Sequence, residues 1–298
     1  MSAGASVSLH ELNAFDRQRF VSTLGAIYEN SPWVAEAAAA DRPYSSLSAL
    51  HERMSGVVLK ADESRKLTLL NAHPDLAGKA ARAGTLTAES EAEQKDAGLD
   101  RLSEKEFFEF HRLNETYRKK FGFPFIICVR RHSKDSLFRQ FDLRTKNDQA
   151  VERNAALKEV IRIAALRLNQ RVAGVDQLNV NGRLSTHVLD AYSGRPAQGV
   201  ALELHELSQV GSDHLIVAGV TNIDGRTDGP LISGRPVPIG GYELRFALGD
   251  YFRRSGIILP DPPFLDKVPV RFSIADPESH YHVPLLATPW SYSIYRGS

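Results

Sequence analysis

The chain has 298 residues, 24% of them charged and 42% hydrophobic, which is ordinary for a globular protein and long enough for two domains. A formal net charge of +1 excludes the strongly basic surfaces typical of nucleic-acid and membrane-surface binding. The single cysteine, Cys128, excludes an internal disulfide framework and favours a reducing compartment. We find neither a signal peptide nor a segment able to span a bilayer, so we expect a cytoplasmic protein with no nucleic-acid or membrane partner.

Apolar residues recur at helical spacing through the first half of the chain. Ser90-x-x-Glu93 and Ser103-x-x-Glu106 each have the spacing of a capping box, and Gly122 is a suitable residue to end the helix that follows the second box. An extended apolar run is expected from Phe123 to Val129. The spacing predicts helices over residues 9–30, 33–40, 46–61, 67–72, 90–99, 103–121, 135–145 and 148–168.

From Gly174 onward the apolar residues alternate, and turn residues become frequent. Short strands with frequent turns are typical of a β-sandwich, and Asp250 to Ser255 is expected to form one short helix. Strands are predicted at 184–190, 200–207, 214–221, 242–248, 268–274 and 281–287. We therefore expect an all-α helical bundle over 1–168, a linker over 169–182 and an all-β sandwich over 183–298.

Three residues of the helical half combine a polar group with apolar surroundings: His73, Glu93 and Arg167. Each has an ordinary explanation when taken alone. His73 lies at a proline turn and could be a capping or core histidine, Glu93 could serve only its capping box, and Arg167 could extend from a helix end toward solvent. Their significance rests on the wider pattern in which they occur.

That pattern is a series of spaced motifs: His73-Pro74-Asp75-Leu76, then Ser90-x-x-Glu93-Gln94-x-x-Ala97-Gly98-Leu99, then Phe110-x-x-Leu113-Asn114-x-x-Tyr117-x-x-Lys120-Phe121-Gly122-Phe123-Pro124-Phe125-Ile126. The series resembles the OHCU decarboxylases of urate breakdown over nearly all of residues 9–170. The resemblance implies an all-helical fold and catalytic roles for His73, Glu93 and Arg167. It also implies substrate contacts from Pro74, Ser90 and Gln94 and from the main chain of Phe125, Ile126, Ile127, Cys128 and Val129.

The chemistry implied by this resemblance suits those residue types. The substrate, 2-oxo-4-hydroxy-4-carboxy-5-ureidoimidazoline, loses CO2 to give allantoin, and its own ring accepts the electron pair, so no cofactor and no metal is expected. Arg167 is expected to grip an anionic oxygen with its planar fork. His73 is expected to donate a proton to one face of the ring, with Glu93 holding its tautomer or charge.

The β half carries a second group of candidates, namely His187, Arg226 and the pair His280 and His282. A histidine within a strand is usually satisfied by the sheet, and an arginine in an Asp-Gly-Arg turn is usually solvated. Because His280 and His282 lie two residues apart on one strand face, their spacing also admits a metal site. The last four residues, Tyr295 to Ser298, would by themselves be a frayed end.

Together with Leu184-Ser185-Thr186-His187-Val188-Leu189-Asp190, Asp224-Gly225-Arg226 and His280-Tyr281-His282-Val283-Pro284-Leu285-Leu286, these residues resemble 5-hydroxyisourate hydrolase, the transthyretin-like enzyme, over about 180–298. The resemblance implies that His187 and His282 orient and deprotonate a water, that Arg226 stabilises negative charge, and that Tyr295 and Ser298 contact substrate without a metal. Ala287-Thr288-Pro289 departs from the Leu-Ser-Pro that is more frequent in the family.

The two resemblances name consecutive steps, since the product of the hydrolase is the substrate of the decarboxylase. They imply a two-step enzyme of urate degradation that yields (S)-allantoin, and homo-oligomers, tetrameric through the β domain with dimer contacts through the helical domain. Two alternatives stay open at this point. One is a transthyretin-like binding module on a helical scaffold, and the other is a zinc amidohydrolase that uses His280 and His282.

Overall fold

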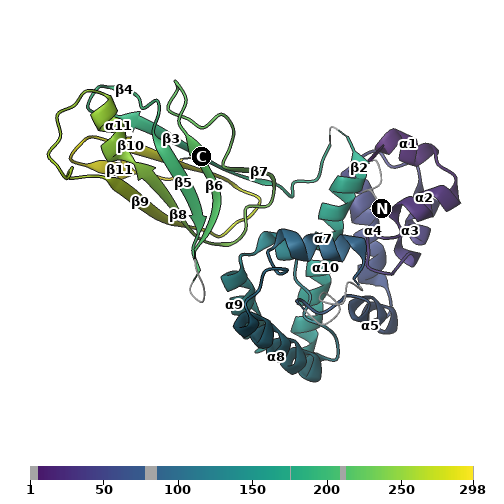
Figure 1. Ribbon diagram of the computed structural model, residues 1–298. Coiled ribbons are helices and arrows are strands. Elements are labelled where there is room, and N and C mark those ends of the chain that lie inside the picture. Colours follow the sequence, from purple (N-terminus) through teal and green to yellow (C-terminus); the bar gives the residue numbers. More distant parts are fainter. Residues whose placement is uncertain (1–5, 78–85, 175, 209–212, 298) are drawn as a thin grey trace. The chain divides into compact units, whose positions relative to one another are not determined.

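The computed structural model describes residues 6–77, 86–174, 176–208 and 213–297, and Figure 1 shows its ribbon. The chain divides into two compact units. The first comprises Met1–Val129 and Leu137–Val180, and the second comprises Arg130–Ser136 and Asn181–Ser298. The first is rich in helices and the second is rich in strands, as the change in hydrophobic period predicts.

The helical unit is organised around one long helix, α10, whose buried side carries Leu157, Val160, Ala164 and Leu168. Two-stranded pairing of β1 (Val7–Ser8) with β2 (Val172–Ala173) ties the start of the described chain to the end of α10. The helices are α1 (Leu9–Ala14), α2 (Arg17–Leu24), α3 (Trp33–Ala38), η1 (Ala39–Asp41), α4 (Leu47–Lys60), α5 (Glu63–Asn71), α7 (Ala88–Asp96), α8 (Glu104–Phe121), η2 (Val129–Arg131), α9 (Lys134–Arg144) and α10 (Gln149–Arg171).

The helix boundaries follow from local capping, with one correction. The expected capping box of Ser103 and Glu106 is present, and Gly122 ends α8 in the left-handed conformation with φ 79°. The predicted box of Ser90 and Glu93 is wrong, because Thr87 caps α7 by accepting a hydrogen bond from the amide of Ser90. The helix therefore begins at Ala88, and its Ser90 and Glu93 side chains are available for other contacts.

Two other expectations on the helical half differ from the structure. The helix expected over 9–30 is divided at Phe15, whose backbone is extended, and Asp16 caps the second piece. The 169–182 segment, expected to be a linker, is largely part of the helical unit: α10 continues to Arg171, Asn169 exchanges two 2.8 Å hydrogen bonds with Leu178, and Leu178 packs on the helical core. Its apolar residues are too few to show a period.

A short segment of the helical half belongs to the β unit instead. Within 130–136, the carbonyl of Arg131 accepts from the amide of Ile239 at 2.8 Å, and the amide of Ser133 donates to the carbonyl of Ile239 at 3.0 Å. The guanidinium of Arg131 also forms two hydrogen bonds to Glu278, at 2.6 and 2.8 Å. These partners are more than a hundred residues away, which is why sequence periodicity gives no sign of them.

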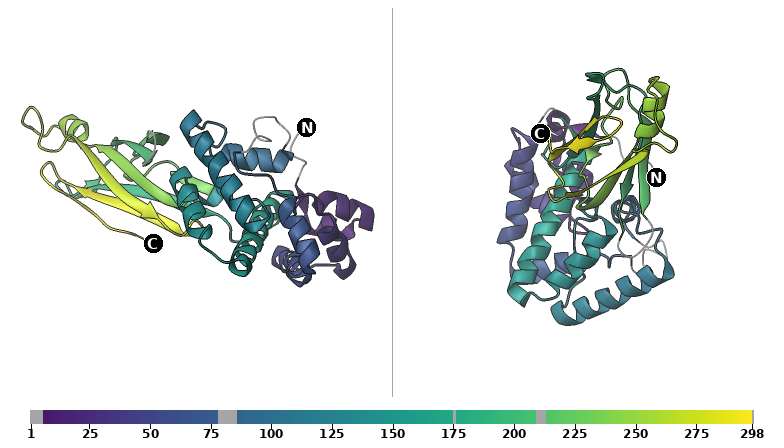
Figure 2. Two further views of the ribbon diagram at one scale, coloured as in Figure 1. Left: turned by 90° about the horizontal axis from the view of Figure 1, so that it is seen from below. Right: turned by 90° about the vertical axis from the view of Figure 1, so that its left-hand side faces the viewer.

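The β unit is a two-sheet sandwich, and α11 lies at one end of it (Figures 1 and 2). One sheet has the order β11-β10-β3-β4, with β7 also paired to β3, and the other has the order β6-β5-β8-β9. The elements are β3 (Gly182–Asp190), β4 (Arg195–Pro196), β5 (Ala201–Glu206), β6 (His214–Val220), β7 (Ile232–Arg235), β8 (Gly240–Ala247), α11 (Leu248–Arg254), β9 (Lys267–Ile274), β10 (His280–Ala287) and β11 (Tyr292–Ile294). All six predicted strands are confirmed; β4, β7 and β11 are additional.

A glycine turn fixes the approach of the 222–226 turn to β3. Gly225 has φ 70°, its carbonyl accepts from the amide of Val188 at 2.8 Å, and a Cβ placed there would lie 2.3 Å from the carbonyl oxygen of Val188. The neighbouring Arg226 then pairs with His187 across an antiparallel bridge. Only glycine satisfies both the left-handed backbone and the close approach.

We predict that Gly225→Ala destabilises the β unit far more than Gly194→Ala. Gly194 has nearly the same dihedral, φ 73°, but no described atom lies within 4 Å of an added Cβ. Backbone strain alone costs about 1–2 kcal/mol, whereas the clash at Gly225 adds about 1–3 kcal/mol more. Denaturant unfolding followed by a β-unit probe measures both. Equal losses in the two variants would contradict this account of the turn.

Candidate functional site

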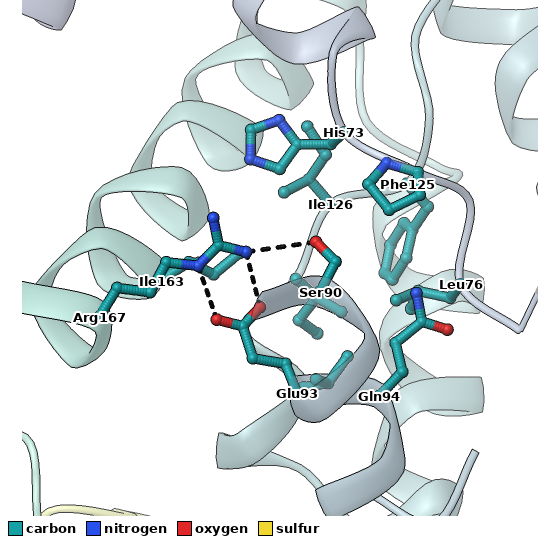
Figure 3. Close-up of a pocket in the computed structure, with 12 residues that line it drawn as sticks. His73, Leu76, Ser90, Glu93, Gln94, Phe125, Ile126, Ile163 and Arg167 are labelled. Carbon is teal, nitrogen blue, oxygen red and sulfur yellow. Dashed lines mark hydrogen bonds and ion pairs between the residues drawn. The ribbon is translucent and has the colours of Figure 1, made fainter. Parts of the chain in front are cut away.

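The helical unit contains one pocket that gathers most of the residues predicted for its site (Figure 3). Its empty volume, including the opening to solvent, is about 360 Å³. Four segments form its wall: the end of α5 with the turn after it, α7, the extended chain after α8, and α10. The lining residues are His73, Pro74, Leu76, Ser90, Glu93, Gln94, Phe125, Ile126, Ile127, Val129, Ile163 and Arg167.

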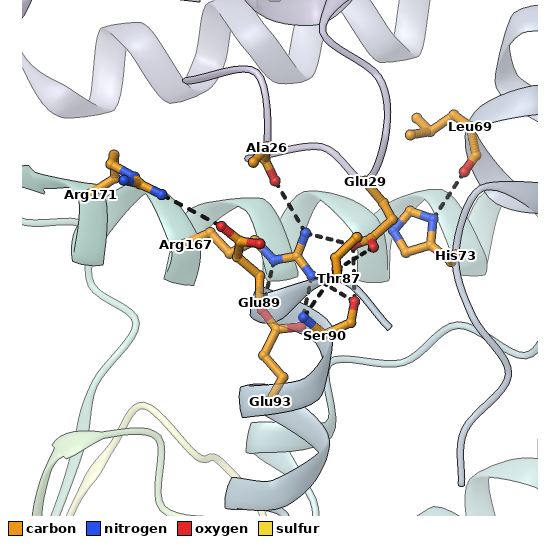
Figure 4. A network of polar contacts seen from close by, with 10 residues as sticks. All are labelled: Ala26, Glu29, Leu69, His73, Thr87, Glu89, Ser90, Glu93, Arg167 and Arg171. Carbon is orange, nitrogen blue, oxygen red and sulfur yellow. Dashed lines mark hydrogen bonds and ion pairs between the residues drawn. The ribbon is translucent and has the colours of Figure 1, made fainter. Parts of the chain in front are cut away.

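Arg167 is the centre of the polar contacts at this pocket (Figure 4). Its Nε and Nη2 donate to the two carboxylate oxygens of Glu93 at 2.7 and 2.9 Å, and Nη2 also donates to the Ser90 hydroxyl at 3.2 Å. Its Nη1 donates to Glu29 at 2.8 Å and to the carbonyl of Ala26 at 3.3 Å. The guanidinium therefore lies between two carboxylates: Glu93 contacts Nε and Nη2, and Glu29 contacts Nη1.

The local sequence explains how these side chains meet. Ile163 and Arg167 are four residues apart on α10 and so share one face of that helix. Ser90 and Glu93 are three residues apart on α7, which places both toward the same guanidinium. Because Thr87 rather than Ser90 caps α7, the Ser90 hydroxyl is released from the backbone and reaches Arg167 instead.

The buried ion pairs shift the pKa values of Arg167 and Glu29. Burial acts against the charged form of Arg167, but the hydrogen bonds and charges of Glu93 and Glu29 outweigh it, so the pKa of Arg167 is raised. Burial would likewise raise the pKa of Glu29, yet the charge of Arg167 and the hydrogen bond from Thr87 lower it. Arg167 and Glu29 are therefore both ionised at neutral pH.

His73 is held in one tautomer at the pocket wall. Its Nδ1 is 2.9 Å from the carbonyl of Leu69, and because a carbonyl only accepts, Nδ1 carries the proton and Nε2 is the nitrogen left for chemistry. Burial lowers the pKa of His73 to about 4, the Leu69 carbonyl and Glu29 opposing this shift and Arg167 adding to it. His73 is therefore neutral at pH 7 in this environment.

The extended chain over 124–128 is held from behind by two buried side chains. Arg144 donates from Nη1 to the carbonyl of Ile126 at 2.7 Å, and the amide of Cys128 donates to Glu159 at 2.9 Å. Cys128 is buried and does not line the pocket, unlike its predicted neighbours Phe125, Ile126, Ile127 and Val129. The amide of Cys128, one of the predicted contacts, is thus engaged by the protein.

Sequence reasoning did not find Glu29. This residue lies between α2 and α3, just before a Ser-Pro pair, and is only 2% exposed. It accepts from Thr87 at 2.6 Å and Ser90 at 3.0 Å as well as from Arg167. Nothing in the spacing around it distinguishes it from a solvated loop glutamate, and only the fold brings it beside residues 58 or more positions away.

The β unit brings the second set of candidates together on the paired strands β3 and β10, which lie in the interior of their sheet. The two strands are parallel, with Ser185 opposite His282, and the Ser185 hydroxyl is 2.9 Å from Nδ1 of His282 and 3.0 Å from Nε2 of His280. His187 pairs with Arg226, and His282 pairs with Gly297, whose amide donates to the carbonyl of His282 at 2.9 Å. Both predicted histidines and the predicted arginine therefore lie close together at the β3–β10 pair.

The surroundings of His187 and His282 favour neutral imidazoles. Burial first, and then the charge of Arg226, lower the pKa values of His187 and His282. Within the described residues, Nε2 of His187 is buried without a hydrogen-bond partner, a costly state unless a ligand or water completes it. Tyr295 is 55% exposed in this chain, and Ser298 lies outside the described residues.

Two searches of the described part of the chain bear on the alternatives. No group of three or more His, Cys, Asp or Glu side chains there is arranged to hold a metal ion, so the His280 and His282 pair has no third described ligand. Among the helices that the structure describes, none has the length and apolar character needed to cross a bilayer.

The folds and their side-chain clusters define a two-unit enzyme, with a pocket built around a buried arginine and its carboxylates in a helical bundle and a histidine–arginine cluster on a β-sandwich. The sequence profile of OHCU decarboxylase matches residues 13–169, and that of the HIUase/Transthyretin family matches 184–297. The chain belongs to the OHCU decarboxylase family through its helical unit and to the HIUase/transthyretin family through its β unit.

Individual relatives agree with this assignment. A 5-hydroxyisourate hydrolase 2 of Rhizobium meliloti is 55% identical over 41% of this chain and 100% of its own length. A 2-oxo-4-hydroxy-4-carboxy-5-ureidoimidazoline decarboxylase of Haloferax volcanii is 42% identical over 55% of this chain and 96% of its own. A solved (S)-allantoin synthase is 36% identical, with a TM-score of 0.52 and coverage of 98% of this chain and 100% of that one.

We predict that Arg167→Met destabilises the helical unit by about 3–5 kcal/mol at pH 7, since it leaves two carboxylates unpaired. Without Arg167, the pKa of buried Glu29 in the folded chain rises above its pKa in the unfolded chain. The loss of stability is therefore complete above the folded-state pKa and disappears as the pH falls through that pKa. Urea unfolding at pH 7 and pH 5 should show the deficit shrinking on acidification.

The matched control is Arg171→Met, which removes only a half-buried 3.5 Å contact with Glu89 on the same two helices. Its cost should be within about 1 kcal/mol. A similar loss for both arginine variants, or a deficit independent of pH, would show that the pairing of Arg167 does not stabilise the unit.

Proposed function

We propose that this chain degrades urate-derived rings in two consecutive steps. The β unit hydrolyses 5-hydroxyisourate, and the helical unit decarboxylates the product, OHCU, to (S)-allantoin. The observation that carries the proposal is the pocket in which His73, Glu93 and Arg167 meet on three separate segments, as the decarboxylase resemblance requires. The match of nearly the whole chain to a solved (S)-allantoin synthase supports joining the two activities.

In the decarboxylation, the bond from the ring carbon to its carboxylate breaks, CO2 leaves, and the electron pair stays on the ring until the carbon takes a proton. His73 delivers that proton from Nε2, because Nδ1 is committed to Leu69. The pKa of His73 is low because the imidazole is buried. The negative charge of a bound substrate raises this pKa, so substrate binding favours the protonation of His73.

The other pocket residues position the ring. Arg167 has all of its donors engaged by protein acceptors, so it acts on the substrate mainly through its charge, rather than as the open fork that its sequence context suggests. Gln94 accepts from the amide of Ala77 through Oε1, which fixes its orientation, and no described residue accepts from its Nε2. That amide can donate to a ring oxygen, with Pro74 and Phe125 against the ring faces.

In the hydrolysis, a water attacks a ring carbonyl, the amide bond breaks, and the departing nitrogen takes a proton. His187 and His282 are neutral at pH 7 and can accept the proton of the attacking water. Arg226 stabilises the oxyanion that forms, a contribution on the order of 10²–10³ in rate. Tyr295 and Ser298 are proposed to contact substrate from the C-terminal segment.

Three further points complete the proposal. The β unit assembles as a tetramer, and the site that contains His187 lies at an interface between copies. The helical unit adds dimer contacts. The enzyme acts in the cytoplasm. The functional domains are 1–168 and 183–298, and the segment 169–182 joins them, although residues 169–180 belong to the helical unit. Size measurement by light scattering tests the first point directly.

Two single substitutions should separate the activities. His73→Ala removes the proton donor, so we expect stereospecific allantoin formation from OHCU to fall about 10²–10⁴-fold while hydrolysis of 5-hydroxyisourate continues. In His187→Ala, hydrolysis of 5-hydroxyisourate should fall while stereospecific decarboxylation of OHCU continues. The hydrolysis is followed by loss of 5-hydroxyisourate absorbance, and the decarboxylation by circular dichroism of allantoin. Each variant serves as the folding control for the other, and loss of both activities in either one would contradict the assignment.

A chelator experiment separates this reading from a zinc amidohydrolase. Because His280 and His282 both bond to the hydroxyl of Ser185, we expect their positions to be set by that hydroxyl and not by a metal. Prolonged dialysis against a strong chelator should leave the hydrolysis rate unchanged. Loss of hydrolysis that added zinc restores would replace the water-activation mechanism by a metal-dependent one.

A further inference from the structure

Glu29 is a buried charged group that the mechanism above does not use. Its carboxylate does not line the pocket, but it lies directly behind the residues that do. Arg167, Thr87 and Ser90 all donate to it, at 2.8, 2.6 and 3.0 Å. Arg167 lies on α10, Thr87 is the N-cap of α7, and Ser90 lies in the first turn of α7. Such a carboxylate is costly to bury, so its partners must stabilise the ionised form.

The hydrogen-bond directions around Glu29 are determined by their partners. The Thr87 hydroxyl accepts from the amide of Ser90, and the Ser90 hydroxyl accepts from Nη2 of Arg167. Each hydroxyl has one proton to give, and both protons point to Glu29. Glu29 thereby orients the Ser90 lone pairs and holds Arg167 from the side opposite Glu93.

The charge of the cluster follows from its members. Two carboxylates and one guanidinium give −2 + 1 = −1, and the cluster becomes neutral only when His73 carries a second proton. The charged groups that act on His73 are Glu29 from the loop after α2 and Arg167 from α10, with Glu93 of α7 reached through Arg167. The 124–128 chain contributes no acidic or basic side chain.

We propose that Glu29 is a positioning residue for the decarboxylation, which fixes the Ser90–Arg167 pair and keeps one negative charge in the cluster beside His73. This inference rests on the proposed function of the helical pocket. Without the charge of Glu29, the Arg167–Glu93 pair alone would be neutral, so the cluster would no longer offer a net negative charge to a proton on His73. With it, the arrival of an anionic substrate leaves the site with excess negative charge, and His73 takes up the proton that it later gives to the ring carbon.

The test is Glu29→Gln in the full chain, with two readouts. The first is the titration of His73, followed by NMR with carbon-13 at histidine Cε1 and assigned through His73→Gln. The second is the pH dependence of kcat for decarboxylation. We expect the His73 midpoint to fall by about one unit, and the pH above which kcat declines to fall in parallel. Glu29→Asp, which keeps the charge, should restore most of both.

Glu89→Gln is the matched control, because Glu89 lies on the same helix as Ser90 but pairs with Arg171 outside the cluster. It should leave the His73 midpoint and the pH profile unchanged. Glu29→Ala removes the same charge without a misplaced amide donor, and it replaces the Gln variant if that variant does not fold.

The outcomes are distinct. An unchanged His73 midpoint in Glu29→Gln, or a rate that falls equally at every pH, would overturn the proposal and leave Glu29 a purely structural residue. If the wild-type chain does not decarboxylate OHCU but the His73 midpoint still falls in Glu29→Gln, the proposed function is refuted and the coupling of Glu29 to His73 is kept. Parallel shifts in both readouts support the full inference.

Discussion

The helical site depends on the burial of one guanidinium between two carboxylates. Arg167 is 5% exposed, and its partners Glu93 and Glu29 come from α7 and from the loop before α3. A buried ion pair adds little net stability compared with apolar packing, because desolvation offsets most of the attraction. Its value here is geometric: the planar fork fixes three segments relative to one another and leaves His73 and Gln94 at the pocket wall in defined orientations.

The same principle recurs behind the pocket loop. Arg144 holds the carbonyl of Ile126, and Glu159 holds the amide of Cys128, so an extended segment without its own hydrogen-bonding partner strand has a fixed backbone. In the β unit, the corresponding constraint is the parallel pairing of β3 with β10, which aligns Ser185 with His282. In both units, chemistry-bearing side chains sit on elements whose register is set by distant contacts, as preorganised sites require.

The sequence predicts the fold class and most of the site because the signals are local or repeated. Helical spacing, alternation and the Ser103 capping box are properties of neighbouring residues, and the structure confirms them. The family resemblance predicts roles for His73, Glu93 and Arg167, and the structure brings these three side chains to one pocket. Ser90 shows the limit of local reading: its spacing to Glu93 fits a capping box, but Thr87 caps the helix and Ser90 serves the ion-pair cluster. Glu29 and the 130–136 segment depend on contacts across the whole unit, which no local pattern reveals.

The central claim is that one chain carries both steps and controls the stereochemistry of the second. The most direct measurement is to add freshly prepared 5-hydroxyisourate to the purified full chain and to follow circular dichroism over time. The account predicts a rapid rise of the signal of a single allantoin enantiomer. A slow reaction that gives optically inactive allantoin, as in the absence of enzyme, would contradict it.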